Sequence, residues 1–439
     1  MSVPQIRIKV EDFRAVSNAD IIIDGITIVA GENGSGKSTL SKLLYYLFKT
    51  ACNYEVLVTG ELNRNLRDIF RFVEIAISEL HISNNKVLRN ELRKELHDLY
   101  DIERFSEEQM ERWSHLINSV KNSYVSIVDE KEKILSERPR RLLYIINDIL
   151  ERESGEKENK KIESLSSSFE KIDEILRSHF KKALGKVKSR PTSLFAEALS
   201  GVFSEGILPK HLEVLEYNEP IFSKDKSNLS IPFSIQNVIY TDTPMVIGME
   251  DAEVEYWNDL NDLLRKRGKS ISSDLSQIIS KEVIKGEVSL DESPSGRDFI
   301  YKRTDGITYD LLDCATGIKS FAILQLLLKN GALNDKTLLI IDEPEVHLHP
   351  QWIVEYARMI VLLNKQLGVK FFIASHDPDF VGAIRYISEK QGNLDKVNYY
   401  FADKKGGNYV YDYMHLGIDI EPIFKSFNRA IERIDQYGA

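Results

Sequence analysis

The start of the chain has two stretches that are rich in branched apolar residues, and a more polar segment separates them. Residues 5–10 (QIRIKV) and 20–30 (DIIIDGITIVA) are rich in Ile and Val, and they predict strands. A glycine-rich turn follows, and residues 40–48 then place apolar side chains at i, i+3, i+4, i+7 and i+8. This spacing predicts an amphipathic helix that begins near Lys37, so that strand, loop and helix follow one another.

The middle of the chain has a different composition. Between residues 60 and 205, charged helix formers dominate, with few glycines and few strand signals. The pattern predicts amphipathic helices of ordinary length that pack as a compact helical lobe, without the sustained heptads of a coiled coil. Residues 153–161 (ESGEKENKK) predict a solvated link between two of these helices.

Strand patterns return near residue 212 and then alternate with helices. We expect strands at 212–217 and 235–241, helices near 250–267, 271–284 and 317–330, short strands near 286–290, 298–303 and 306–310, a strand KTLLIID, a helix from Pro350, a strand VKFFIAS, and a final hairpin with a closing helix. Alternating β and α elements predict an α/β fold with a mainly parallel sheet. The expected domains are 1–55, a helical insertion at 56–210, and 211–439.

The glycine-rich turn carries the first chemical motif. Residues 31–39 (GENGSGKST) match GxxxxGK[ST] between a strand and a helix, which is the context that a phosphate-binding loop requires. Its backbone N–H groups and the helix N-terminus favour phosphates. We expect Lys37 to reach the β and γ phosphates of ATP, Ser38 to ligate Mg²⁺ and Thr39 to touch the α-phosphate. The expected nucleotide contacts are Glu32, Asn33, Gly34, Ser35, Gly36, Lys37, Ser38 and Thr39.

Two later strands deliver polar residues at their carboxyl ends, where open α/β sheets bind ligands. Residues 338–343 (LLIIDE) end in Asp342, expected to hold Mg²⁺, and Glu343, expected to act as general base on the attacking water. Alone, this pattern is more often a plain strand end, but a P-loop in the same chain favours the functional interpretation. Residues 369–376 end in His376, which could contact the γ-phosphate or the water.

Composition narrows the class of protein. The chain has 439 residues, a formal net charge of −10 and only two cysteines, Cys52 and Cys314, which excludes a disulfide framework and a four-cysteine zinc site. No apolar run approaches the roughly 18 residues of a membrane span, and the start does not resemble a signal peptide. We therefore expect a cytoplasmic protein that does not associate with a membrane. His347 and His349 lack a third ligand cluster, so a metal pair is disfavoured.

Basic residues gather in three places. They could follow the phosphates of a nucleic acid, although the acidic net charge favours ordinary solvated helix faces, and nucleic acid stays a possible partner. The three clusters are Arg138, Arg140 and Arg141; Lys181, Lys182, Lys186, Lys188 and Arg190; and Arg265, Lys266, Arg267 and Lys269.

Four motifs together resemble ABC ATPases. GENGSGKST, CATGIKS (314–320), LLIIDEPEVHLHP (338–350) and ASH (374–376) occur in the ABC order. The chain is similar to the non-transporter branch of RecF, SMC and OLD-type ATPases, in which a helical insertion separates Walker A from the later motifs. The resemblance implies an ABC-type P-loop ATPase head that uses ATP and Mg²⁺, forms head-to-head dimers and hydrolyses ATP slowly.

The same resemblance assigns further residues. Thr316, Gly317 and Lys319 would form the signature that meets the γ-phosphate across the dimer, residues 347–349 would fall in the D-loop, and His376 would be the switch histidine. The signature departs from its usual form, because Ala315 stands where a serine is typical.

Two assignments stay open. No glutamine matches the Q-loop cleanly, since Gln236 precedes its strand, while Thr241 and Asp242 follow it. Phe13 and Arg14 resemble an aromatic-arginine element that borders the nucleotide in this branch, but a core Phe and a surface Arg explain them equally well.

A closer resemblance concerns the segments TGIKSFAILQLLLKNG and DEPEVHLHPQW. They are most similar to the PtuA family of ATPase subunits from Septu anti-phage systems and to retron-associated relatives. This implies a defence complex in which the ATPase controls a separate effector nuclease, of HNH type by resemblance, because the chain shows no nuclease signature and too few residues after His376 for a Toprim domain. The alternative is a RecF-like DNA maintenance ATPase. A transporter subunit is disfavoured, and a non-hydrolysing nucleotide sensor stays open.

Overall fold

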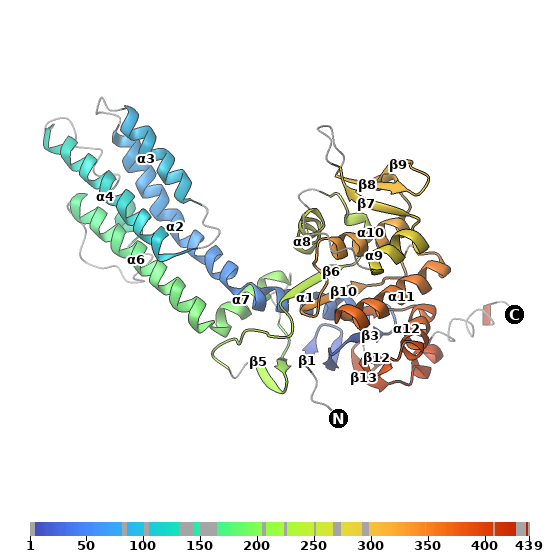
Figure 1. Ribbon diagram of the computed structural model, residues 1–439. Coiled ribbons are helices and arrows are strands. Elements are labelled where there is room, and N and C mark those ends of the chain that lie inside the picture. Colours follow the sequence, from blue (N-terminus) through green and yellow to red (C-terminus); the bar gives the residue numbers. More distant parts are fainter. Residues whose placement is uncertain are drawn as a thin grey trace. The chain divides into compact units, whose positions relative to one another are not determined.

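The structure is a computed structural model of the chain (Figure 1). It describes residues 5–80, 86–100, 105–130, 142, 144–149, 165–203, 208–223, 226–249, 252–266, 274–291, 298–346, 348–406, 409–426 and 436–437. The chain divides into two compact units, one made of Met1–Cys52 with Thr192–Ala439 and the other of Asn53–Pro191. Helix α7 (Thr192–Val202) therefore belongs with the larger unit, inside the range expected for the insertion. The domain limits drawn from the sequence stay a prediction.

The larger unit is built on one ten-stranded sheet with the strand order β5-β4-β1-β2-β13-β12-β3-β11-β10-β6. The five strands β12, β3, β11, β10 and β6 are parallel throughout, whereas the opposite half of the sheet is mostly antiparallel. The predicted α/β fold with a parallel core is confirmed. The strands are β1 (Ile6–Phe13), β2 (Val16–Ile22), β3 (Ile26–Ala30), β4 (His211–Glu216), β5 (Glu219–Ser223), β6 (Asn237–Thr241), β10 (Thr337–Asp342), β11 (Lys370–Ser375), β12 (Val397–Lys404) and β13 (Tyr411–Gly417).

The stretch 20–30, which predicts strand structure punctuated by Gly25, belongs to two strands with different partners. β2 ends at Ile22 and pairs antiparallel with β1, whereas β3 begins at Ile26 and joins the parallel core between β11 and β12. Gly25 lies between them, and a Cβ there would stand 2.3 Å from the Lys396 carbonyl oxygen, so only glycine fits the turn. β5 was not predicted; Pro220 lowers its strand signal and is tolerated because β5 is an edge strand.

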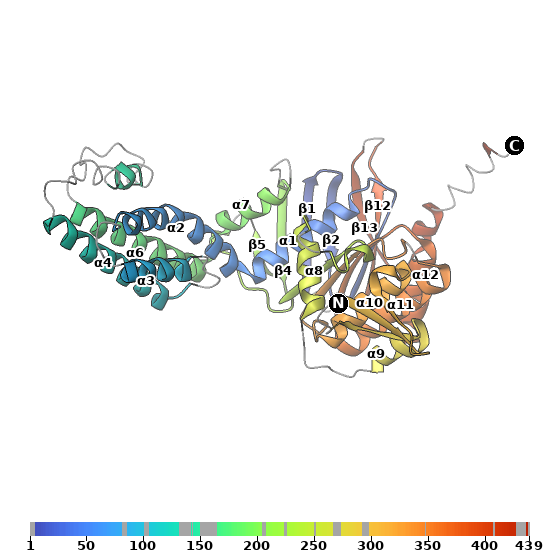
Figure 2. The same ribbon diagram turned by 90° about the horizontal axis from the view of Figure 1, so that it is seen from above.

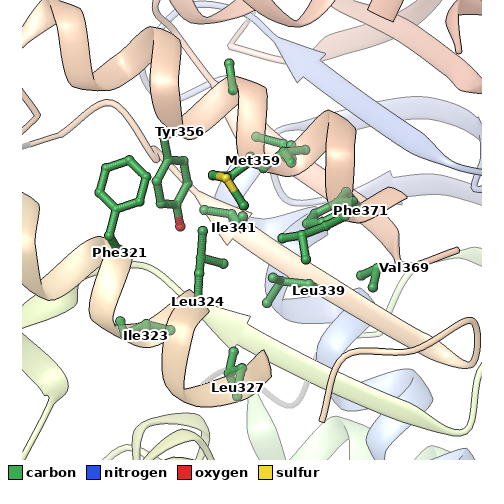
Figure 3. Close-up of a cluster of buried hydrophobic side chains, with 14 of the residues drawn as sticks. Phe321, Ile323, Leu324, Leu327, Leu339, Ile341, Tyr356, Met359, Val369 and Phe371 are labelled. Carbon is green, nitrogen blue, oxygen red and sulfur yellow. The ribbon is translucent and has the colours of Figure 1, made fainter. Parts of the chain in front are cut away.

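Helices cover both faces of the parallel core. Helix α1 (Lys37–Cys52) packs against β6, β10 and β11 on one face. On the other face, α10 (Thr316–Lys329), α11 (Pro350–Leu367) and α12 (Pro378–Lys390) bury the alternate side chains of the strands, Leu339 and Ile341 among them. Figure 3 shows these two residues with Phe371, Phe321 and Tyr356 in one continuous cluster. A core buried on both faces explains why strands 26–30, 337–342 and 370–375 are almost wholly apolar.

A second, antiparallel sheet of three strands lies in the same unit, with the order β7-β8-β9. The three short strands that the sequence predicts there are confirmed. Of the helix expected at 271–284, the described residues from Asp274 onward form a short α segment followed by a π turn. The remaining elements are η2 (Pro244–Val246), α8 (Glu255–Arg265), α9 (Asp274–Ile278), the π-helix η3 (Ile279–Val283), β7 (Gly286–Leu290), β8 (Phe299–Arg303), β9 (Thr308–Asp310), η4 (Leu311–Asp313) and η5 (Leu394–Lys396).

The smaller unit is helical. Its described helices α2 (Tyr54–Glu79), α3 (Lys86–Leu99), α4 (Glu107–Glu130) and α6 (Leu165–Ser189) lie side by side in both views (Figures 1 and 2). Their apolar faces bury Trp113 and pack Phe72 against Phe169, with ring centroids 5.2 Å apart. Arg177 joins α6 to α4 through Glu111, at 2.8 Å. The predicted link at 153–161 and the cluster Arg138, Arg140 and Arg141 lie outside the described residues.

Within the described ranges, no helix combines the length and the apolar character that crossing a bilayer requires.

Candidate functional site

The register of three neighbouring parallel strands brings the sequence motifs to one edge of the sheet. Ala30, which precedes the P-loop, pairs with Ser375, and Ala374 pairs with Asp342. Because all three strands run in the same direction, their carboxyl ends meet at this edge. The P-loop, the Asp342-Glu343 pair and His376 therefore converge on one site, although the P-loop lies far from the other two in the sequence.

The P-loop has the backbone conformation that its glycines permit. Gly34 and Gly36 have φ angles of 80° and 94°, which residues with a Cβ rarely adopt. A Cβ on Gly36 would lie 3.0 Å from Val16 Cγ2, so Gly36 is also held by packing. The Tyr413 hydroxyl, from the C-terminal hairpin, donates to the Ser35 carbonyl oxygen at 2.8 Å and is buried. The hairpin thus fixes the position of the loop.

Lys37 lies folded back over this loop. Its side chain is buried, and Nζ donates to the carbonyl oxygens of Gly31 at 2.9 Å and Glu32 at 3.0 Å. Burial lowers the pKa of Lys37, and the nearby carboxylates of Glu343 and Asp342 oppose this shift. An ammonium in this position faces acids on one side and the phosphate-binding loop on the other.

Asp342 is a buried carboxylate at the end of β10. The Tyr240 hydroxyl donates to Oδ2 at 3.1 Å. Burial raises the pKa of Asp342, while hydrogen bonds from the Tyr240 and Ser38 hydroxyls act in the opposite direction. Ser38 and Asp342, the two residues predicted to hold Mg²⁺, therefore lie close enough for the Ser38 hydroxyl to affect the pKa of Asp342.

The site has unmet hydrogen-bonding capacity where a ligand would bind. Asp342 Oδ1 and Ser35 Oγ are buried and have no hydrogen-bond partner within the described residues. Unsatisfied buried polar atoms are costly, so they usually mark a place where an ion, water or ligand completes the structure. Carboxylate and hydroxyl oxygens are the ligands that Mg²⁺ prefers. The residues present thus fit the predicted magnesium nucleotide.

Glu343 and His376 lie beside each other at the rim of this site. His376 Nδ1 is 3.3 Å from Glu343 Oε1 and 3.2 Å from Glu345 Oε1. Glu343 has a φ of 53°, in the left-handed region, and its N–H donates to the Ala374 carbonyl oxygen at 2.8 Å. This unusual backbone for a non-glycine residue turns the chain sharply after β10 and is a marker of a functional position.

A cavity of about 570 Å³ opens next to the P-loop and is lined in part by Ser38 and Thr39. Arg14 lies on its wall, with its guanidinium 5.1 Å from the ring centroid of Phe203. Phe13 is wholly buried and packs on Phe203, so it is a core residue in this structure. The sequence left the roles of Phe13 and Arg14 open. In the structure, Arg14 borders the candidate nucleotide site, and Phe13 is buried in the core beside it.

The candidates for the Q-loop lie at opposite edges of the sheet. Thr241 ends β6 opposite Ile341, at the same edge as Asp342, whereas Gln236 precedes the first rung of the strand at the opposite edge. Asp242 accepts hydrogen bonds from Trp257 Nε1 at 2.8 Å and the Tyr256 hydroxyl at 3.2 Å. Helix α8 thus holds Asp242 in place.

The predicted signature residues have local structural contacts. Lys319 is 7% exposed, and its Nζ donates to the Leu312 carbonyl oxygen at 2.7 Å. A Cβ on Gly317 would lie 2.6 Å from the Trp352 ring, so this glycine allows α10 and α11 to pack closely. Thr316 begins α10, after Ala315, which makes no side-chain cap. Their action across a dimer stays a prediction.

The histidines after Glu343 have different positions. His349 is the N-cap of α11, because its Nδ1 accepts from the Gln351 N–H at 3.4 Å. His347 lies outside the described residues, so its place in the predicted D-loop is not described.

Most of this chain matches a known protein family. The family whose sequence model matches residues 6–381 is described as AAA ATPase domain. The chain belongs to this ATPase family. The expectation of a P-loop ATPase is therefore confirmed, since the match spans Walker A, the helical insertion and both later strands. No curated protein matches the chain.

Solved structures similar to this chain include heads of SMC proteins. They include the SmcHead bound to the C-winged helix domain of ScpA, at 12% identity over 95% of this chain and 99% of that chain with a TM-score of 0.40. The SMC head domain from Thermotoga maritima is 10% identical over 95% and 99%, with a TM-score of 0.36. Scores of this size carry no argument about function, so the assignment of this ATPase domain rests on the family match.

Three contributors to the candidate site were not predicted from the sequence. Glu345 contacts His376, Tyr240 holds Asp342, and Tyr413 holds the P-loop. A third carboxylate in the sequence DEPE is a weak signal for Glu345, since it stands two residues after the expected general base. The two tyrosines lie in ordinary strand patterns and carry no local signal.

The Tyr413 hydroxyl offers a direct test of how the hairpin supports the P-loop. Tyr413→Phe should weaken ATP binding several-fold and lower the free energy of unfolding by about 1 kcal/mol, because one buried hydrogen bond to the loop is lost. Calorimetric titration with ATP and thermal unfolding would measure both changes.

Tyr399→Phe is the matched control. The Tyr399 hydroxyl is also buried but has no hydrogen-bond partner within the described residues, so its removal should leave binding unchanged. Equal effects of the two substitutions on ATP binding would contradict the role of Tyr413.

Proposed function

We propose that this chain binds ATP with Mg²⁺ and hydrolyses it at the shared edge of β3, β10 and β11. The observation that carries the proposal is the convergence of Lys37, Asp342, Glu343 and His376 through the strand register. In the proposed complex, the P-loop N–H groups and Lys37 bind the β and γ phosphates, while Ser38 and Asp342 hold Mg²⁺. The metal supplies positive charge that offsets the charge of the transferring phosphoryl group.

The remaining residues act on the attacking water. Glu343 accepts a proton from the water while the oxygen of that water bonds to the γ-phosphorus. The bond from that phosphorus to the bridging oxygen of ADP breaks at the same time. The products are ADP and inorganic phosphate. The Glu343 backbone, fixed by its hydrogen bond to Ala374, positions the carboxylate, and His376 contacts the γ-phosphate from the neighbouring strand. The cavity beside Ser38, Thr39 and Arg14 supports a place for the nucleoside.

Two substitutions separate binding from hydrolysis. Lys37→Ala should weaken ATP binding by about 10- to 100-fold, because a charge-assisted contact to phosphate is lost. Glu343→Gln should keep ATP binding but lower kcat by about 100-fold or more, because the amide cannot accept the proton. Titration calorimetry and phosphate release would measure these effects.

Lys302→Ala, at an exposed position of β8, is the control for loss of a positive charge and should change neither quantity. Normal hydrolysis by Glu343→Gln would show that Glu343 is not the general base.

We also infer that two copies dimerise head to head through ATP. The sequence resemblance to RecF, SMC and OLD-type ATPases supports this, with Thr316, Gly317 and Lys319 as the signature. The start of α10 adds a physical reason, because a helix N-terminus without a side-chain cap is suited to a phosphate from a partner copy.

At the level of biology, we propose a cytoplasmic ATPase subunit of a bacterial anti-phage complex that controls a separate effector nuclease. The resemblance to Septu and retron-associated ATPase subunits supports this role. Co-expression with the products of neighbouring genes, followed by size-exclusion chromatography, should yield a stable complex with a nuclease. The Glu343→Gln chain in ATP should elute as a dimer or larger species. A chain that stays alone with every neighbour would contradict the subunit role.

A second candidate is a RecF-like ATPase that binds DNA, and one surface favours it. On α6, Lys181, Lys182 and Lys188 are exposed, whereas Lys186 is paired with Glu61 at 2.5 Å. Reversing the charge of the three exposed lysines should abolish ATP-dependent binding of a DNA duplex if this function is correct, with Lys186 left unchanged. Absence of DNA binding by the unsubstituted chain at low salt would exclude it.

A further inference from the structure

Glu345 is a buried carboxylate for which the proposed reaction has no role. It follows β10 in the turn after Glu343, and its side chain is only 5% exposed. A carboxylate in such a place loses its hydration, and this cost must be offset by donors in the protein. Burial raises the pKa of Glu345, and the backbone and side-chain donors around it act against that shift.

Two residues at the end of β11 donate hydrogen bonds to Glu345. Oε1 accepts from the His376 N–H at 2.8 Å and from the Ser375 hydroxyl at 3.0 Å. The same oxygen lies 3.2 Å from His376 Nδ1. Glu345 therefore holds the backbone of one residue and lies beside its ring, and that residue is the histidine expected to meet the γ-phosphate.

The orientation of the His376 ring follows from these contacts. Nδ1 is buried and faces two carboxylates, yet it makes no hydrogen bond of good geometry within the described residues. The side chain is nevertheless 40% exposed, so other atoms of the ring reach solvent, and Nε2 is the ring nitrogen left to meet a ligand.

The two carboxylates that face Nδ1 differ in their freedom. Glu343 is 36% exposed, whereas Glu345 is held by two hydrogen bonds and has almost no access to solvent. Glu345 is thus the fixed partner of His376, and Glu343 is the one that can turn away toward a water molecule. A fixed carboxylate that binds one imidazole nitrogen sets which nitrogen carries the proton and where the other one points.

We propose that Glu345 is a positioning residue for His376, which keeps the proton on Nδ1, presents Nε2 to the γ-phosphate and leaves Glu343 free to act as base. The inference rests on the proposed ATPase function. It adds a third carboxylate with a role distinct from metal binding by Asp342 and from base catalysis by Glu343.

Kinetics of three chains test this role. Glu345→Ala should lower kcat by about 10- to 100-fold with little change in the Kd for ATP, as is typical when the partner of a functional histidine is lost. Glu345→Gln keeps an oxygen that can accept from His376 and should retain more activity than Glu345→Ala. Glu355→Gln, a half-exposed acid on α11, is the matched control and should hydrolyse ATP normally.

A double substitution shows whether Glu345 acts through His376. If it does, His376→Ala and Glu345→Ala combined should be no slower than His376→Ala alone, because the positioned group is already absent. Multiplied losses in the double variant, or an unchanged kcat in Glu345→Ala, would overturn the proposal.

The tautomer of His376 can be measured without an activity assay. Histidine labelled with ¹⁵N, with the His376 signal identified from its loss in His376→Gln, should show the proton on Nδ1 in the unsubstituted chain and on Nε2 in Glu345→Ala. A proton on Nε2 in the unsubstituted chain overturns the proposal even when ATP is hydrolysed. Failure of the ATPase function itself would instead appear as absent phosphate release with the Nδ1–H tautomer intact.

Discussion

The site depends on the register of three adjacent parallel strands. Ala30, Asp342 and Ser375 end β3, β10 and β11 at the same edge, and hydrogen bonding between the strands fixes them against one another. A slip of one residue would turn every side chain to the other face of the sheet. The apolar residues of β10 and β11, packed by α1 on one face and by α10 to α12 on the other, prevent that slip. The hydrophobic core thus sets the geometry of the polar site.

Charge burial is the second constraint. Lys37, Asp342 and Glu345 are all nearly inaccessible to water, and each would be costly to bury alone. Each has partners instead: carbonyl oxygens for Lys37, the Tyr240 hydroxyl for Asp342, and the end of β11 for Glu345. Asp342 Oδ1 and Ser35 Oγ stay without a partner in the described part of the chain, which is where the proposed ligands bind. Fixed donors and acceptors of this kind need little reorganisation during reaction.

The sequence predicts what depends on local pattern. The P-loop between a strand and a helix, the apolar strand that ends at Asp342, and the fold class all follow from short segments read alone. Gly25 punctuates the apolar stretch 20–30, but only the pairing partners show that β2 and β3 join different parts of the sheet. Helix α7 resembles the helices of the insertion in composition, yet it packs with α1 in the larger unit.

The supporting residues of the site could not be predicted in this way. Tyr240 and Tyr413 act on partners 102 and 378 residues away, so their roles exist only after the sheet has formed. Glu345 is buried because β11 returns beside it.

A crystal structure of Glu343→Gln grown with Mg²⁺ and ATP tests the whole account most directly. It should show the triphosphate along the N–H groups of the P-loop, the metal between Ser38 and Asp342, and His376 Nε2 facing the γ-phosphate. A nucleotide bound at any other edge of the sheet would contradict it.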